Sequence, residues 1–187
     1  SPSDWTSLAA TDFSNPENTG FIDNFSLLPR VQDDFFYFRF DGFIFIDSAG
    51  AYEFRTTSND GSRLILNGDT IVNNDGIHDL VTVTSHTVDL ATGPQRITVD
   101  FFDHAEADSL LVEYRGPDTD TIWTSIPDAV LSTTRPEEIE GNEETPPEEE
   151  IVGTEDRPGE PVCRIFPNPA EQHNINVIVT RSDDRPV

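Results

Sequence analysis

The chain has 187 residues, which is enough for one sizeable domain with extensions and hardly enough for two full domains. Its 36 acidic residues outnumber its 11 basic residues, all of them arginine, and the formal net charge is −25. Because such a field repels phosphates and anionic headgroups, the composition argues against nucleic-acid binding and electrostatic membrane binding. Its apolar runs are all shorter than the roughly 18 residues that a membrane span requires, so no membrane insertion is predicted.

The first 40 residues predict loops followed by a central strand. Residues 1–32 mix apolar side chains with Asn, Pro and Gly and show no helical period, which favours edge strands and packed loops. Phe36, Phe38 and Phe40 then occupy alternate positions, so their three rings fall on one face of an extended strand. Aromatic residues at this spacing indicate a core strand rather than a ligand platform.

A meander of short strands is predicted for the middle of the chain. Asn67-Gly68 lies between alternating apolar residues and is a strong hairpin signal. The predicted strands and hairpins cover residues 43–47, 51–57, 64–72, 80–83, 86–90, 96–102 and 110–115, with a last strand within 121–131. Evenly spaced short strands with almost no helical period define an all-β domain, which we place at residues 1–134.

The composition changes sharply after this domain. Residues 135–161 are rich in Glu and Pro, and such a segment cannot bury enough apolar surface to offset its chain entropy, so an extended acidic linker is predicted. Residues 162–187 are again apolar and strand-like. Ile175, Val177 and Val179 share one face there, and a strand without a core of its own needs a partner.

Five ordered segments of the meander carry a family resemblance: FIFIDSAGAYEF from Phe43, SNDGSRL from Ser58, VNNDGIH from Val72, LATG from Leu90 and FFD from Phe101. Together they resemble the protective-antigen-type β-sandwich family, the "PA-fourteen" domain, over roughly Trp5 to Leu131. The resemblance implies a two-sheet antiparallel β-sandwich, which often binds carbohydrate in secreted or cell-surface adhesins, toxins and glycosidases. Phe166-Pro-Asn-Pro-Ala resembles the start of a type IX secretion sorting domain, and residues 162–187 would be an incomplete copy.

The motifs that accompany catalysis are missing from the sequence. It contains no nucleophile elbow, no His-Glu-x-x-His helix and no phosphate loop. Its four histidines, at positions 78, 86, 104 and 173, do not have the spacing of zinc ligands. We therefore expect a binding protein rather than an enzyme.

The resemblance also implies a calcium site. Sugar-binding relatives hold Ca²⁺ with two consecutive aspartates joined by a cis peptide and complete the cage with a second loop. Here the matching pair is Asn59 and Asp60, and the matching loop offers Asp103 and Asp108. Ca²⁺ accepts amide and carboxylate oxygens, although one charge fewer weakens its binding. The residues expected to contact the sugar are Asn59, Asp60, His104 and Glu106.

Two structural readings stand beside this one. Ser58 to Gly61 forms a sequence common in simple turns, and the loop at residues 73–78 is predicted to be structural, with His78 bonded to the backbone.

At the level of function, the main hypothesis is a secreted or cell-surface module that binds glycan with Ca²⁺. The alternative is a structural subunit of a fibre or surface layer, which self-associates through Ile175, Val177 and Val179.

The acid excess leads to a prediction about salt. If it reflects adaptation to high salt, the melting temperature should rise as NaCl increases from low to molar concentration, because counter-ions screen the repulsion among carboxylates. Thermal unfolding followed by circular dichroism measures this. A melting temperature that stays flat or falls over the range would contradict salt adaptation.

Overall fold

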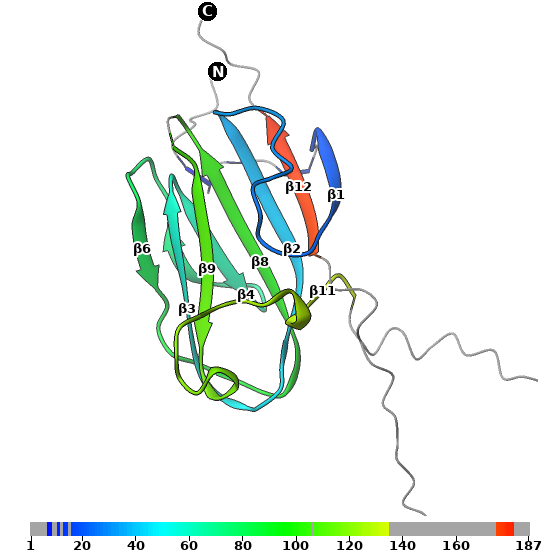
Figure 1. Ribbon diagram of the computed structural model, residues 1–187, viewed down its shortest axis with the longest axis vertical. Helices are drawn as coiled ribbons and strands as arrows, with labels where there is room; N and C mark the ends of the chain where they lie inside the picture. The colour runs from blue at the N-terminus through cyan, green and yellow to red at the C-terminus, as the bar shows by residue number, and fades with distance from the viewer. Residues whose placement is uncertain are drawn as a thin grey trace, which may run out of the picture.

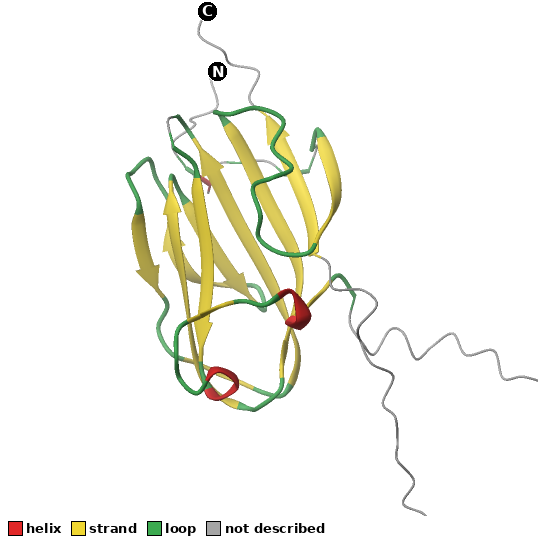
Figure 2. Ribbon diagram, in the orientation of Figure 1, coloured by secondary structure: helices red, strands yellow, loops and turns green. Residues whose placement is uncertain are grey.

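The computed structural model describes residues 7–8, 11, 13–14, 16–105, 107–134 and 175–181. Two antiparallel sheets face each other across a common core (Figure 1), which confirms the predicted all-β two-sheet sandwich. Helical residues in the described part occur in short turns, such as Pro117–Thr119 and Asp128–Val130 (Figure 2). None of these turns has the length or hydropathy of a membrane-spanning helix.

The larger sheet has seven strands. Its order is β1 (Asn18–Ile22), β12 (Ile175–Arg181), β2 (Phe36–Ile46), β8 (Gly93–Asp103), β4 (Ser62–Leu66) and β5 (Asp69–Asn74), with β11 (Leu131–Ser132) also pairing with β2. Asn67 and Gly68 connect β4 to β5 with φ angles of 52° and 96°, which confirms the predicted hairpin turn.

The smaller sheet has five strands and covers one face of the larger one. Its order is β10 (Thr124–Ser125), β9 (Ser109–Arg115), β3 (Gly50–Asn59) and β6 (Val81–Thr84), with β7 (Val88–Leu90) also pairing with β3. Tyr52, Phe54 and Tyr114 point from this sheet into the core. They meet Phe36, Phe38 and Phe40 of β2, which are fully buried, as the alternation predicted.

The outer face of the larger sheet carries a second, smaller cluster. Tyr37 and Phe102 pack there against Leu8 and Phe13 of the N-terminal segment. Beside them the buried carboxylate of Asp100 accepts hydrogen bonds from Arg39 and Arg63, both at 2.7 Å. These interactions hold described parts of the N-terminal segment on the sheet, because Arg63 also donates to the Leu8 carbonyl and Arg39 lies over the Phe13 ring.

The C-terminal strand differs from the expectation that residues 162–187 form a separate segment. β12 lies between β1 and β2, and its side chains Ile175 and Val177 are buried in the core of the same chain. The physical reason is the exposed edge of β2, where Gly42 leaves room for the side chain of Ile175. The predicted linker at 135–161 and the sorting-domain motif lie outside the described residues.

This placement predicts that Ile175 contributes to the stability of the sandwich. Ile175→Ala should lower the free energy of unfolding by about 2–4 kcal/mol, because it removes a fully buried side chain. Asn176→Ala, on the neighbouring and partly exposed position, is the matched control. Urea denaturation of both variants measures the difference, and an Ile175→Ala protein as stable as the control would show that β12 is not part of the sheet.

Candidate functional site

Strand register brings several loops together at one end of the sandwich, the upper end in Figure 1. Phe36 at the start of β2 is opposite Asp103 at the end of β8, and Asn59 at the end of β3 is opposite Ser109 at the start of β9. The turn after β3 and the loop after β8 are therefore neighbours, as the sequence predicted. Such loops can present ligand-binding groups on a rigid scaffold.

The turn after β3 is tightly packed. The Asn59–Asp60 peptide bond is cis, as the family resemblance implied for this position. Gly61 is required by close approach, because a Cβ atom there would collide with the ring of Phe102. The Phe102 amide also donates to the Gly61 carbonyl at 2.9 Å. The turn is thereby fixed against the end of β8.

Asp60 joins this turn to two other loops. Its side chain is 3% exposed, and its Oδ1 accepts a hydrogen bond from the His78 amide at 3.0 Å. Its Oδ2 accepts one from the His104 amide at 2.8 Å. Charge-assisted bonds of this kind are stronger than neutral ones. Asp60 is thus a structural centre of the site as well as a candidate ligand, and its removal would leave two backbone amides without these partners.

The loop that carries His78 is held by its own contacts. The two ring nitrogens of His78 lie 2.7 Å from the Asp79 carbonyl oxygen and 3.0 Å from the Asn74 carbonyl oxygen, which confirms the predicted bonding to backbone. Asp75 accepts hydrogen bonds from the Ser7 hydroxyl at 2.6 Å and the Leu8 amide at 2.7 Å. This loop is therefore structural, as predicted, and it links the N-terminal segment to the site.

A buried polar network lies beneath the turn. The hydroxyl oxygens of Ser58 and Ser62 are 2.8 Å apart, and Ser62 donates to Thr56 at 2.8 Å. The Asn74 amide nitrogen donates to Ser58 and to the Val81 carbonyl. Because these buried groups are bonded to one another, they fix the strands on which the turn stands.

Asp103 is the unusual member of the site. It is fully buried, and neither of its carboxylate oxygens has a well-formed hydrogen bond within the described part of the chain. Its pKa is raised to about 7, chiefly by burial and in addition by the negative charges of Asp60, Asp108 and Asp34, while the Phe35 amide has a smaller, lowering effect. A buried carboxylate without partners costs free energy unless a cation or a proton compensates it.

The remaining predicted residues have different surroundings. Asp108 forms an ion pair with Arg30 at 3.3 Å, and the ring of His104 lies edge-on to Phe35, with centroids 5.1 Å apart. Asn59 is partly exposed at the turn. Glu106 lies outside the described residues.

Sequence reasoning missed Asp34. Its charge acts on Asp103 because residue 34 precedes β2, whose first residue pairs with Asp103. The sequence shows Asp33-Asp34 directly before an aromatic strand. It does not show that Asp34 lies near Asp103, because that depends on which strand pairs with β2.

The chemistry of this set suits a hard cation that takes oxygen ligands. Three or more His, Cys, Asp or Glu side chains do not converge into a metal-binding group anywhere in the described residues. A cation here would therefore also need amide or backbone oxygens and water, which Ca²⁺ accepts and zinc does not favour.

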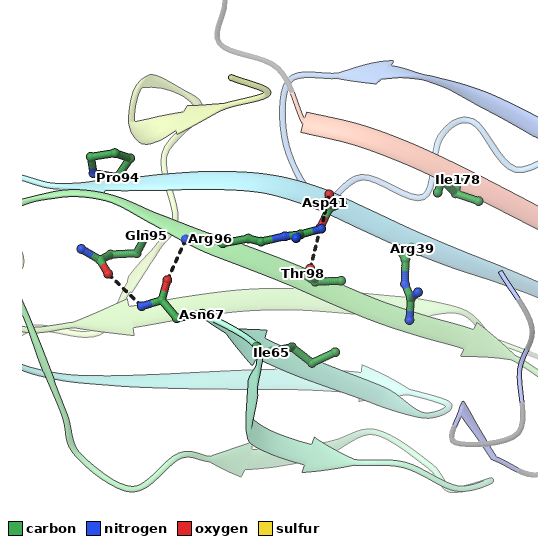
Figure 3. Close-up of a pocket in the computed structure, with 10 residues that line it drawn as sticks. Arg39, Asp41, Ile65, Asn67, Pro94, Gln95, Arg96, Thr98 and Ile178 are labelled. Carbon is green, nitrogen blue, oxygen red and sulfur yellow. Dashed lines mark hydrogen bonds and ion pairs between the residues drawn. The ribbon is translucent and has the colours of Figure 1, made fainter. Parts of the chain in front are cut away.

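A larger hollow lies elsewhere, on the outer face of the larger sheet (Figure 3). It has a volume of about 820 Å³, but its polar groups already bond to one another. Thr98 donates to Asp41 at 2.6 Å, Arg96 pairs with Asp41, and Asn67 bonds both Gln95 and the Arg96 amide. The upper end of the sandwich is the better candidate site, because its buried Asp103 carboxylate has no well-formed hydrogen bond within the described residues.

Several solved structures are similar to the chain. The PA14 domain of the MpAFP antifreeze protein is 23% identical, with a TM-score of 0.47, and the match covers 52% of this chain and 51% of that one. A PA14 sugar-binding domain from an RTX adhesin is 26% identical, with a TM-score of 0.41, over 46% of this chain and 48% of that one. An anti-sigma factor domain-containing protein from Clostridium clariflavum is 21% identical, with a TM-score of 0.45, and the match covers 50% of this chain and 31% of that one.

The chain thus spans about half the length of the first two structures, and no curated protein matches it. The model of the PA14 domain matches residues 7–122, which include β2 to β9 and all the loops of the candidate site. This match covers more than half of the chain and agrees with the observed two-sheet sandwich. The chain therefore belongs to the PA14 domain family.

Proposed function

We propose that this PA14 domain is a secreted or cell-surface recognition module that binds neutral glycan through a Ca²⁺ ion at the upper end of the sandwich. The observation that carries the proposal is the buried carboxylate of Asp103, whose two oxygens make no well-formed hydrogen bond within the described residues and feel the charges of three further aspartates. Membership of the PA14 family supports it, because the resemblance described above implies carbohydrate binding.

The residues present fit a calcium ion. Asp103 would supply an unpaired carboxylate, and Asp60 would supply a carboxylate that two backbone amides hold in place. Asn59 would supply an amide oxygen where sugar-binding relatives carry an aspartate. Asp108 contributes negative charge, while its ion pair with Arg30 holds it at the rim. The ion would also remove the cost of burying Asp103 unpaired.

Bound Ca²⁺ supplies open coordination positions that two adjacent sugar hydroxyls can occupy. The chain's own residues then orient the sugar at the rim. His104 donates its amide hydrogen to Asp60, and its ring lies edge-on to Phe35, so we propose this pair of rings as the surface against which the sugar would pack. Glu106 is proposed as a hydroxyl acceptor on the same loop. A shallow site of this type gives a dissociation constant of about 0.1–10 mM, and useful adhesion would come from many copies.

The structural alternative is less well supported. It requires that the C-terminal strand pair with a neighbouring subunit through Ile175, Val177 and Val179. In the structure β12 is already paired on both edges, with β1 on one side and β2 on the other. These two pairings occupy the edges through which it would have to pair with a neighbouring subunit. Binding rather than fibre formation is therefore the function that we propose.

Calcium binding is tested most sharply at Asp103. Asp103→Asn should abolish Ca²⁺ binding and glycan binding together while preserving the fold, because it keeps the shape and removes the charge. Asn59→Asp should tighten Ca²⁺ binding, since it restores a carboxylate. Isothermal titration calorimetry measures both effects, with Asp89→Asn as a control on an exposed aspartate of β7. No heat of binding to the unmodified chain at millimolar Ca²⁺ would refute the proposal.

A second prediction concerns pH in the absence of metal. The Asp103 pKa is about 7 in the folded chain, above its unfolded value of 3.8, so its contribution to stability is fully present below pH 4 and is lost as pH rises through 7. In chelator, Asp103→Asn should therefore become progressively more stable than the unmodified chain between pH 4 and 8. The gap should reach a few kcal/mol, at about 1.4 kcal/mol per pKa unit.

Denaturation at several pH values with EDTA or with Ca²⁺ measures this gap. Ca²⁺ should stabilise the unmodified chain at pH 8 and leave Asp103→Asn unchanged, because an ion that binds the folded state stabilises it. A gap that does not vary with pH would mean that Asp103 has a partner that compensates its charge.

A further inference from the structure

A second hollow lies beside the candidate site. It has a volume of about 450 Å³, within the range of about 300–1,000 Å³ that is typical of small-molecule sites. The loop after β1 forms one wall, with Leu28 and Arg30, and the start of β9 forms the other, with Ser109 and Leu110. We refer to this hollow as the β1–β9 groove.

The groove is continuous with the candidate site through Asp108. This residue lines the groove, and it precedes Ser109, which is opposite Asn59 of the candidate site in the pairing of β9 with β3. Its ion pair with Arg30, at 3.3 Å, therefore stands at the boundary between the two. This contact uses one terminal nitrogen of a guanidinium group that has five N–H donors.

The loop wall is held in shape before any ligand arrives. Its backbone turns through bonds from the Ser26 amide to the Asn24 carbonyl and from the Arg30 amide to the Leu27 carbonyl. The Asn24 side chain is anchored to the Ile126 carbonyl at 2.8 Å and to Asp128 at 2.6 Å. On this fixed loop Leu28 is 85% exposed, which places a large apolar side chain in solvent beside the site.

We infer that the β1–β9 groove is a second sugar subsite, so that the domain recognises a neutral disaccharide or longer glycan rather than a single sugar. The inference rests on the proposed function, because the first sugar is the one held at the ion. A sugar ring has an apolar C–H face and a rim of hydroxyl groups, and the groove matches both. Leu28 and Leu110 offer apolar surface, while Ser109 and Arg30 offer hydrogen-bonding groups.

Charge selects the class of sugar. Arg30 is already neutralised by Asp108, and Asp34, Asp60 and Asp103 lie on the site side of this pair. A uronate or sulfated sugar would meet this negative field, and the described side chains around the groove include no unpaired cation to balance it. A neutral sugar ring is not repelled by these carboxylates, so we assign the groove to neutral sugars.

The test compares one sugar with two in the full chain at saturating Ca²⁺. Methyl α-mannoside, methyl β-galactoside and methyl β-glucoside are titrated first by NMR, followed by the disaccharide of whichever sugar binds. The disaccharide should bind about fivefold or more tightly than the monosaccharide. Leu28→Ser should remove most of this gain in affinity, and Leu28→Trp should increase it. In both variants the dissociation constants for Ca²⁺ and for the monosaccharide should stay within about twofold of those of the unmodified chain.

Ile122→Ser provides the matched control, because Ile122 is 65% exposed and lies between β9 and β10, in the segment that follows Arg115 at the end of β9 opposite to Ser109. It should leave the disaccharide gain unchanged. If monosaccharides bind but the disaccharide binds no more tightly, or if the gain survives Leu28→Ser, the subsite is overturned and the calcium site stands. If neither Ca²⁺ nor any monosaccharide binds, the proposed function is wrong and the subsite falls with it.

Discussion

The pairing of β2 with β8 is the interaction on which the rest of the structure depends. These strands are joined over eleven residue pairs, from Phe36 opposite Asp103 to Ile46 opposite Gly93. The pairing places Phe36, Phe38, Phe40 and Phe101 on the inner face, and it places Tyr37, Phe102 and the Arg39–Asp100 ion pair on the outer face. The register also fixes where β8 ends relative to β2, so that Asp103 lies opposite Phe36, the first residue of β2. The site is thus a consequence of sheet register.

Charge is distributed unevenly over this framework. All six arginines whose side chains are described are ion-paired, and five of them lie on the faces of the sheets. Arg30 is the exception, because it lies on a loop next to the site. Among the described side chains, Arg30 is therefore the arginine that lies beside the acidic residues of the upper end. In a protein with a net charge of −25, this leaves an excess of negative charge at the site proposed for a cation.

Local patterns in the sequence predicted most of the fold and part of the site. The alternation of Phe36, Phe38 and Phe40 and the Asn67-Gly68 turn are encoded by neighbouring residues, so both could be read directly. The placement of Asp60 beside the second loop followed from the family resemblance. By contrast, the role of Asp34 depends on which strand lies opposite Asp103, and the burial of Ile175 depends on a pairing across more than a hundred residues. Periodicity does not report such distant contacts.

The position of β12 has a consequence for the order in which the sheet is built. β1, near the start of the chain, reaches the larger sheet through β12, because β12 is the strand that separates it from β2. The first described strand therefore cannot take its place until the last one has done so. Pairing β12 with β2 closes a loop of more than a hundred residues, which is entropically unfavourable and slows folding. During synthesis the centre of the sandwich can assemble early, whereas this edge must wait until residue 181 has left the ribosome.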